Sequence, residues 1–393
     1  MKILLPIFIL IIFLGCGDPA TSEVEEGNQE ATTTAAADEE PYVLPEADYY
    51  LTVSDSIGVE LGDSNYVFGA IVGLDFASNG DMAILDMQKS AVSIFSPTGE
   101  FIQRVGRNGS APGEFLLPAG MSFRPDGGLV VADAMGSKLV FFDENYELIT
   151  ETVGFIPSPP AQIIALEGED IIGMKPDFEQ TEDGMFMGFT VARWNMESSE
   201  PLQVFYEQMS PFDPTDLSAM TDDIVVFTAT KDGRVFTAAM SSESYSFTAF
   251  DAEGKEFYTF EEENFERVPK TQSEIDLETE VVNSRMIAQG MPPAMANWEP
   301  DPYRIGIASM FVDGYDRLWV TKGTTTTATF DVYSLDGDLL FTAALDVGER
   351  ADTWTLAIGE NGFACFDIDP EYYPQLYFGS LPVQEQDQGN TQN

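Results

Sequence analysis

The chain is 393 residues long and carries 67 acidic and 18 basic side chains, which gives a formal net charge of −49. This charge argues against nucleic-acid binding, because phosphate backbones require clustered lysine and arginine. The chain contains no histidine, which removes Ser-His-Asp and Cys-His catalysis and histidine-ligated zinc.

The amino-terminal residues have the pattern of an export signal. Lys2 is followed by an apolar run from Ile3 to Leu14, which is too short for a membrane span and ends at Gly15-Cys16. This segment resembles a bacterial lipoprotein signal, although Phe13 and Leu14 depart from the usual residues. The resemblance implies that residues 1–15 are a signal peptide and that Cys16 is the lipid attachment residue.

The lipoprotein resemblance also implies a location in the cell. A lipid on Cys16 would make the membrane a partner and place the protein at the bacterial cell envelope, in the outer membrane or at the cell surface or periplasm. A plain amino-terminal anchor and an ordinary export signal remain alternatives.

Both flanks of the central region are polar. Residues 16–48 are acidic and rich in alanine and threonine, with almost no large apolar side chain before Tyr42. Such a segment cannot bury enough apolar surface to fold, so we expect a disordered tether there and a disordered tail at 384–393.

The central region, residues 49–383, contains an internal repeat. The stretch VGLDFASNGDMAILDMQKSAVSIFSPTGEF, which begins at Val72, aligns without a gap with AGMSFRPDGGLVVADAMGSKLVFFDENYEL, which begins at Ala119. Weaker units begin near Ala161, Phe227, Ala308 and Trp354. Each strong unit reads as four short strands separated by turn residues, and periods of this length are typical of propeller blades. Six units predict a six-bladed β-propeller.

The glycine-rich stretch VGRNGSAPGEF, residues 105–115, connects two of these units. It lacks the Gly-Lys-Ser/Thr ending of a phosphate-binding loop, and no helical pattern follows it. We therefore interpret it as a connection between blades.

The two ends of the central region complement one another. The stretch YYLTVSDSIGVELG, residues 49–62, looks like a fourth strand without its first three, and the last unit lacks a fourth strand. We expect the ring to close by pairing these amino- and carboxyl-terminal strands, which leaves only short, protected edges.

One segment interrupts the strands. Thr271 and Glu274 have capping-box spacing, and Ile275, Val282 and Met286 recur at helical intervals. The pattern predicts a helical insertion near residues 272–289, which either packs against the ring or forms a lid over its channel.

The stretches GSAPGEFLLPAGMSF and PDGGLVVADAMGSKLVFF are similar to NHL repeats, and the clear similarity covers residues 57–150. The overall layout resembles TolB-like propellers and bacterial lipoproteins of the six-bladed β-propeller type. This resemblance implies an all-β six-bladed fold and says little about activity.

Few residues stand out as candidates for chemistry. Asp86, Asp133 and Asp367 end the second strand of three units, where we expect them to accept turn hydrogen bonds and not to bind metal. Cys365 is expected to be a small buried strand residue. Three arginines either pair with carboxylates or face the channel and bind an anion there: Arg107, Arg124 and Arg304.

Two function classes follow. The first is a non-catalytic, envelope-anchored binding or scaffold protein that uses a loop face or the channel to bind a protein or a small ligand. The second, by resemblance to other six-bladed propellers, is a calcium-dependent hydrolase or lactonase with an acidic metal site in the channel. The sequence assigns no catalytic, metal or binding residue and no cofactor, and calcium belongs only to the second class.

Overall fold

The computed structural model describes residues 43–182, 184–212, 224–288, 299–325, 327–347, 354–359, 362–367 and 372–382. The expected signal peptide, Cys16, most of the expected tether and the expected tail lie outside these residues. Within them, no helix is both long and apolar enough to cross a bilayer.

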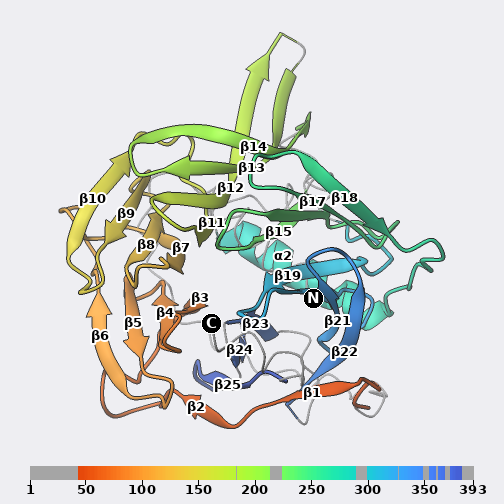
Figure 1. Ribbon diagram of the computed structural model, residues 1–393, viewed down its shortest axis with the longest axis horizontal. Coiled ribbons are helices and arrows are strands. Elements are labelled where there is room, and N and C mark those ends of the chain that lie inside the picture. The colour runs from red at the N-terminus through yellow and green to blue at the C-terminus, as the bar shows by residue number, and fades with distance from the viewer. Residues whose placement is uncertain are drawn as a thin grey trace.

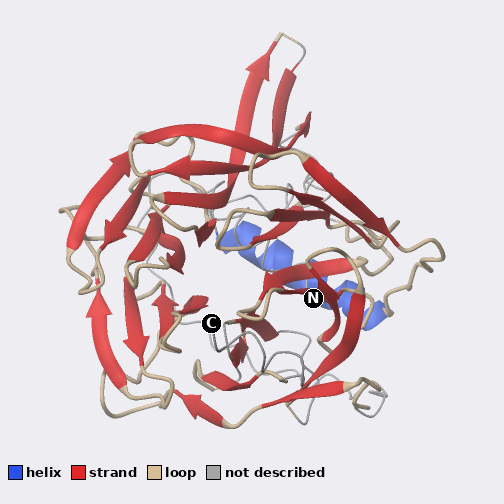
Figure 2. Cartoon of the chain, in the orientation of Figure 1, coloured by secondary structure: helices blue, strands red, loops and turns tan. Residues whose placement is uncertain are grey.

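Six small sheets form a ring, and each sheet is one blade of a propeller (Figure 1). Apart from the two amino-terminal strands β1 and β2, neighbouring strands of a blade are consecutive in the chain and antiparallel, and the first strand of each blade lies closest to the centre of the ring. Figure 2 shows that strands dominate the described chain, with one helix. The predicted all-β six-bladed propeller is therefore confirmed.

The strands of the first three blades are β3 (Ile71–Phe76), β4 (Met82–Asp86), β5 (Ala91–Phe95) and β6 (Phe101–Val105); β7 (Pro118–Phe123), β8 (Leu129–Asp133), β9 (Lys138–Phe142) and β10 (Leu148–Val153); and β11 (Gln162–Ala165), β12 (Asp170–Thr181), β13 (Gly184–Asn195) and β14 (Ser198–Pro211). Those of the last three are β15 (Val225–Ala229), β16 (Val235–Ala239), β17 (Ser246–Phe250) and β18 (Glu256–Glu261); β19 (Ile307–Val312), β20 (Arg317–Lys322), β21 (Thr329–Ser334) and β22 (Leu339–Asp346); and β23 (Trp354–Ile358), β24 (Gly362–Asp367) and β25 (Leu376–Ser380).

The repeated turn sequences have repeated turn geometry. Gly80 and Gly127 occupy equivalent places between the first and second strands, with φ of +87° and +88°. Their amides donate to Ala77 O and Arg124 O, at 2.8 and 2.9 Å. This backbone conformation is accessible to glycine at little cost, which explains why the turn recurs with glycine in both units.

The third blade departs from the repeat. Strands β12, β13 and β14 have 12, 12 and 14 residues, and their far ends protrude from the ring (Figure 1). The edge-to-face contact of Phe178 with Phe212 lies in this extension, with ring centroids 6.2 Å apart. The added length explains why this unit is the weakest match to the repeat.

The ring closes through an amino-terminal strand, as expected, but with a shorter segment than the sequence indicated. Only β2 (Asp55–Ile57) becomes the fourth strand of the last blade, where it pairs antiparallel with β25. The preceding β1 (Tyr49–Thr52) instead adds to the fifth blade, parallel to β22. Leu51 is fully buried there, and the Asp48 carboxylate accepts hydrogen bonds from the amide and hydroxyl of Thr342 at 2.8 and 2.9 Å.

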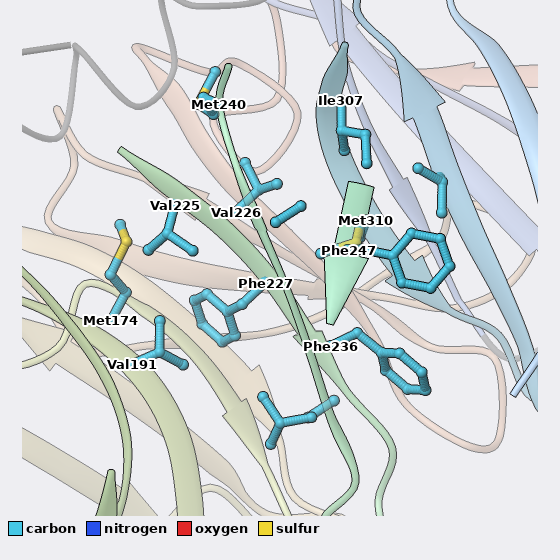
Figure 3. Close-up of a cluster of buried hydrophobic side chains, with 14 of the residues drawn as sticks. Met174, Val191, Val225, Val226, Phe227, Phe236, Met240, Phe247, Ile307 and Met310 are labelled. Atoms are coloured by element: carbon cyan, nitrogen blue, oxygen red, sulfur yellow. The ribbon is translucent and has the colours of Figure 1, made fainter. Parts of the chain in front are cut away.

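The core lies between neighbouring blades. Figure 3 shows one cluster, in which Val191 of the third blade, Phe227 of the fourth and Met310 of the fifth belong to the same buried set. All three side chains are less than 8% exposed. Each blade therefore covers the apolar face of the next. A single small sheet needs this contact because its apolar face must be buried against another element.

The predicted insertion is the helix α2 (Gln272–Ala288), and it begins with the expected capping box. The amide of Thr271 donates to Glu274 Oε2 at 2.8 Å, and the amide of Glu274 donates to Thr271 Oγ1 at 3.3 Å. Val282 is 3% exposed and belongs to the core cluster of Figure 3, so α2 packs against the ring. The side chain of Met286 lies outside the described part of the structure.

Candidate binding site in the central channel

A cavity of about 660 Å³ occupies the centre of the ring. Its walls come from the first strands of all six blades, β3, β7, β11, β15, β19 and β23, with additions from the turns that follow them. Because the inner strands run in the same direction, the cavity has two distinct ends. We name the end where these strands begin the entry end, and the end where they turn into the second strands the turn end.

The two ends differ in chemistry. The inner strands contribute apolar side chains at the entry end: Val72, Ala119, Ala161, Val226, Ala308 and Trp354. The turn end is lined by charged side chains: Arg124, Glu167, Lys231, Asp232, Asp313 and Asp316. Phe76, Phe123 and Val312 also lie at the turn end, so apolar side chains line the whole channel and most of the charged ones are concentrated at one end.

Three uncharged polar side chains from three different blades line this cavity, two near the entry end and one nearer the turn end. They are Gln162 on β11, Thr228 on β15 and Thr355 on β23. Within the part of the chain that the structure describes, none of the three side chains makes a hydrogen bond. Thr228 is only 4% exposed. Buried polar groups nearly always have a hydrogen-bond partner. Because these three side chains have none in the described chain, they are free to form hydrogen bonds with water or with a ligand.

A hydrogen-bonded chain fixes one side of the wall. The Ser122 hydroxyl donates to Asp75 Oδ2 at 3.0 Å, and Ser122 Oγ accepts from the amide of Ala165 at 3.1 Å. The amide of Phe123 donates to the same Asp75 oxygen at 2.6 Å. These contacts join the inner strands of the first three blades, and a wall held this way is preorganised. The sequence did not single out Asp75 or Ser122, although they occupy equivalent positions in the repeat.

Two of the charged groups at the turn end are neutralised. Arg124 Nη2 lies 2.8 Å from Asp126 Oδ2. Asp313 Oδ2 lies 2.7 Å from Arg317 Nη2 and accepts from Trp319 Nε1 at 2.8 Å. Burial raises the pKa of Asp313, and these partners act against that rise.

The other charges of the turn end are more open to solvent. Glu167, Asp232 and Asp316 are exposed and come from the third, fourth and fifth blades. The Lys231 ammonium reaches back to Phe123 O of the second blade, at 3.5 Å. No carboxylate of the described chain forms an ion pair with Lys231, whereas Asp232 lies 3.7 Å from Arg234 Nε.

Two of the three aspartates that end second strands, Asp86 and Asp133, accept backbone hydrogen bonds. Asp86 accepts from the amides of Gly69 and Ala70 at 2.9 and 3.1 Å. Asp133 is fully buried, and its Oδ1 accepts from Leu117 N at 2.7 Å. Asp367 ends β24, but the residues that follow it are outside the described chain.

The candidate arginines all have carboxylate partners. Arg107 Nη2 lies 2.7 Å from Glu114, and Arg304 forms two contacts of 2.9 Å with Glu274. Arg124 pairs with Asp126 and also lines the channel. Cys365 is fully buried in β24, where burial raises the pKa of its thiol to about 12.

No group of three or more aspartate, glutamate or cysteine side chains in the described residues is arranged to hold a metal ion.

Comparison with known proteins supports the fold. A family model described as a 6-bladed beta-propeller matches residues 63–288, more than half of the chain. A search of the curated proteins found no match.

Three solved structures are similar over most of their length. A member of the duf4221 family from Bacteroides vulgatus shares 11% identity over 84% of this chain and 98% of that one, with a TM-score of 0.49. A protein from Bacteroides fragilis, provisionally described as exported, shares 13% over 85% and 99%, with a TM-score of 0.48. A gluconolactonase from Xanthomonas campestris shares 12% over 87% and 99%, with a TM-score of 0.47. Likeness at this level carries no inference about activity.

Proposed function

We propose that this chain, which belongs to the 6-bladed beta-propeller family, is a non-catalytic binding protein that holds a small ligand in its central channel. A lipid on Cys16 would anchor it to the bacterial cell envelope, through the acidic segment that precedes residue 49. The amino-terminal sequence supports this anchoring, and the channel supports the binding.

The observation that carries the proposal is the set of free polar groups in an otherwise mostly apolar channel. Ligand sites are typically cavities of about 300–1,000 Å³ with apolar walls and a few convergent polar groups. The channel, at about 660 Å³, has this size, and Gln162, Thr228 and Thr355 supply such groups. The absence of histidine from the whole sequence supports binding over catalysis, since it removes the commonest general base.

The test is a titration with N-phenyl-1-naphthylamine, an uncharged apolar fluorophore. We expect saturable binding to one site per chain. Gln162→Trp and Ala357→Trp add bulk to the channel wall on two different blades. Each should weaken binding by about tenfold or more, which corresponds to a loss of about 1.4 kcal/mol of binding free energy.

The matched control is Ala111→Trp, which adds the same bulk at an exposed position outside the channel. Circular dichroism and thermal unfolding identify which variants remain folded, and the two channel variants serve as independent tests. Absence of saturable binding, or equal binding by folded channel variants and the control, would overturn the proposal.

A further inference from the structure

The charges at the turn end of the channel are unevenly distributed. Three adjacent blades each place one exposed carboxylate there: Glu167, Asp232 and Asp316. Arg124 is paired with Asp126, Asp232 lies 3.7 Å from Arg234 Nε, and the Lys231 ammonium extends back toward the second blade. Among the described residues, Glu167 and Asp316 form no ion pair, so negative charge is in excess on the arc from the third to the fifth blade.

These carboxylates are not arranged as a metal site. Among the described residues, no group of three is close enough to hold a metal ion. A diffuse organic cation needs no such convergence, because an ammonium or guanidinium group interacts with carboxylates over several ångströms as a spread charge.

A second observation indicates that a ligand reaches this region from inside the channel. Thr228 lies on the inner strand β15, and the turn that follows this strand carries Asp232. The side chain of Thr228 lines the cavity. The residue is 4% exposed, and its hydroxyl has no hydrogen-bond partner in the described chain. A ligand that extends from the turn end into the apolar part would contact this hydroxyl on its way.

The whole molecule favours the same sign of charge. A protein with a net charge of −49 attracts cations and repels anions, and a cleft with low-dielectric walls concentrates this field. The change from an apolar entry end to an acidic turn end therefore matches a molecule that has an apolar body and a positive head.

We infer that the channel ligand is a cationic amphiphile, whose ammonium or guanidinium head lies among Glu167, Asp232 and Asp316 and whose apolar body extends toward the entry end. This inference rests on the proposed function, since it assigns a chemical class to the ligand of the same channel. The apolar body would contact side chains such as Met310 and Phe227, which line the wall.

The test compares three probes that share a decyl chain: decyltrimethylammonium, decanol and decanoate. Each displaces N-phenyl-1-naphthylamine from the protein at pH 8, below its micelle-forming concentration. We expect decyltrimethylammonium to bind about tenfold more tightly than decanoate at low ionic strength. The preference should fall toward unity in about 1 M salt, where the Debye length is about 3 Å.

Single neutralised variants locate the head. Glu167→Gln and Asp316→Asn should each weaken decyltrimethylammonium about threefold and leave decanol unchanged, since only the charged head interacts with the carboxylates. The matched control is Glu253→Gln, which removes one exposed carboxylate in the turn before β18, outside the channel. It should change neither probe.

The outcomes separate the two proposals. If the fluorophore itself does not bind the channel, the proposed function fails. If it binds but decanoate competes as well as decyltrimethylammonium, or Glu253→Gln weakens the cation as much as Glu167→Gln does, the channel remains a binding site and the cationic head is wrong.

Discussion

At the residue scale, an aspartate at the end of the second strand connects each of the first two blades to the segment that enters it. Asp86 and Asp133 stand at the same place in two blades, and each accepts amides from the chain just before its own first strand. A charged acceptor for two amides is stronger than a neutral one. The repeat in the sequence predicted that these aspartates accept hydrogen bonds in the turns, but not that their partners include the amides that precede the first strand of the blade.

Replacing Asp133 tests this connection. Asp133→Ala should lower the free energy of unfolding by about 2–3 kcal/mol, because the amides of Leu116 and Leu117 lose a charged acceptor. Urea denaturation followed by circular dichroism measures the change. Glu144→Ala, at an exposed position in the same blade, should stay within about 0.5 kcal/mol of the parent. Equal stability of the two variants would contradict the assigned role.

At the element scale, α2 is held to the ring by charge as much as by apolar contact. Lys270 Nζ lies 2.7 Å from Glu278 Oε2, and both side chains are almost fully buried. Arg304 holds Glu274 at the first turn of the helix. The capping box was readable in the sequence because it is local. The pairing with Arg304 was not, since that residue is 30 positions downstream and meets the helix only after the chain has returned to the fifth blade.

The pH dependence of stability tests the Glu274 contact. Burial alone would raise the pKa of Glu274, but hydrogen bonds from Arg304 and Thr271 outweigh it and lower the pKa from 4.5 to about 2. A carboxyl whose pKa is lowered by folding stabilises the fold above its unfolded pKa, and this contribution is lost as the pH falls from about 4.5 toward 2. Glu274→Gln should therefore be less stable than the parent at pH 6, with a difference that shrinks as the pH is lowered.

Urea midpoints of the parent and Glu274→Gln between pH 6 and pH 2.5 give this difference directly. Glu280→Gln removes an exposed carboxylate from the same helix and serves as the control, with no pH-dependent difference from the parent. A constant difference for Glu274→Gln over the whole range would show that the ion pair has no such effect.

The segment before the first blade shows a second limit of the sequence. The continuous β pattern from Tyr49 to Gly62 predicted one closing strand, and the ring does close through β2. The chain changes blade after Thr52, so β1 joins the fifth blade instead. Addition of a parallel strand to an outer edge requires only β-forming residues, so the local pattern does not indicate which blade the strand joins.

At the scale of the whole molecule, the offset between repeats was sufficient to predict the ring, whereas the channel was not predictable from it. Gln162, Thr228 and Thr355, whose side chains make no hydrogen bond within the described chain, line the channel from three blades and lie far apart in the sequence. No local pattern marks them, because each is a single position on a strand whose neighbours are apolar. They form a set only when the ring brings the six inner strands together.

The net charge of the whole molecule gives a further prediction. With 67 acidic and 18 basic side chains, self-repulsion destabilises the compact state, and added salt screens it. The melting temperature should rise by about 2–5 °C between roughly 10 mM and 500 mM NaCl, which is the size of shift that about 1–2 kcal/mol produces in a domain of more than 150 residues. Differential scanning fluorimetry measures it, with KCl as a check on ion identity. A melting temperature that falls or stays flat would show that local ion pairs outweigh the repulsion.

The path of the chain through β1 and β2 determines how the ring responds to traction. A pull on the residues before Asp48, directed along β1, loads the hydrogen bonds to β22 in shear, so that they resist together and do not open one after another. After β1 the chain continues into β2, which pairs with the last blade and closes the ring. The pulling force does not reach this pairing until β1 separates from β22. A propeller pulled from its amino-terminal side would therefore stay closed until β1 separates from β22 in the fifth blade.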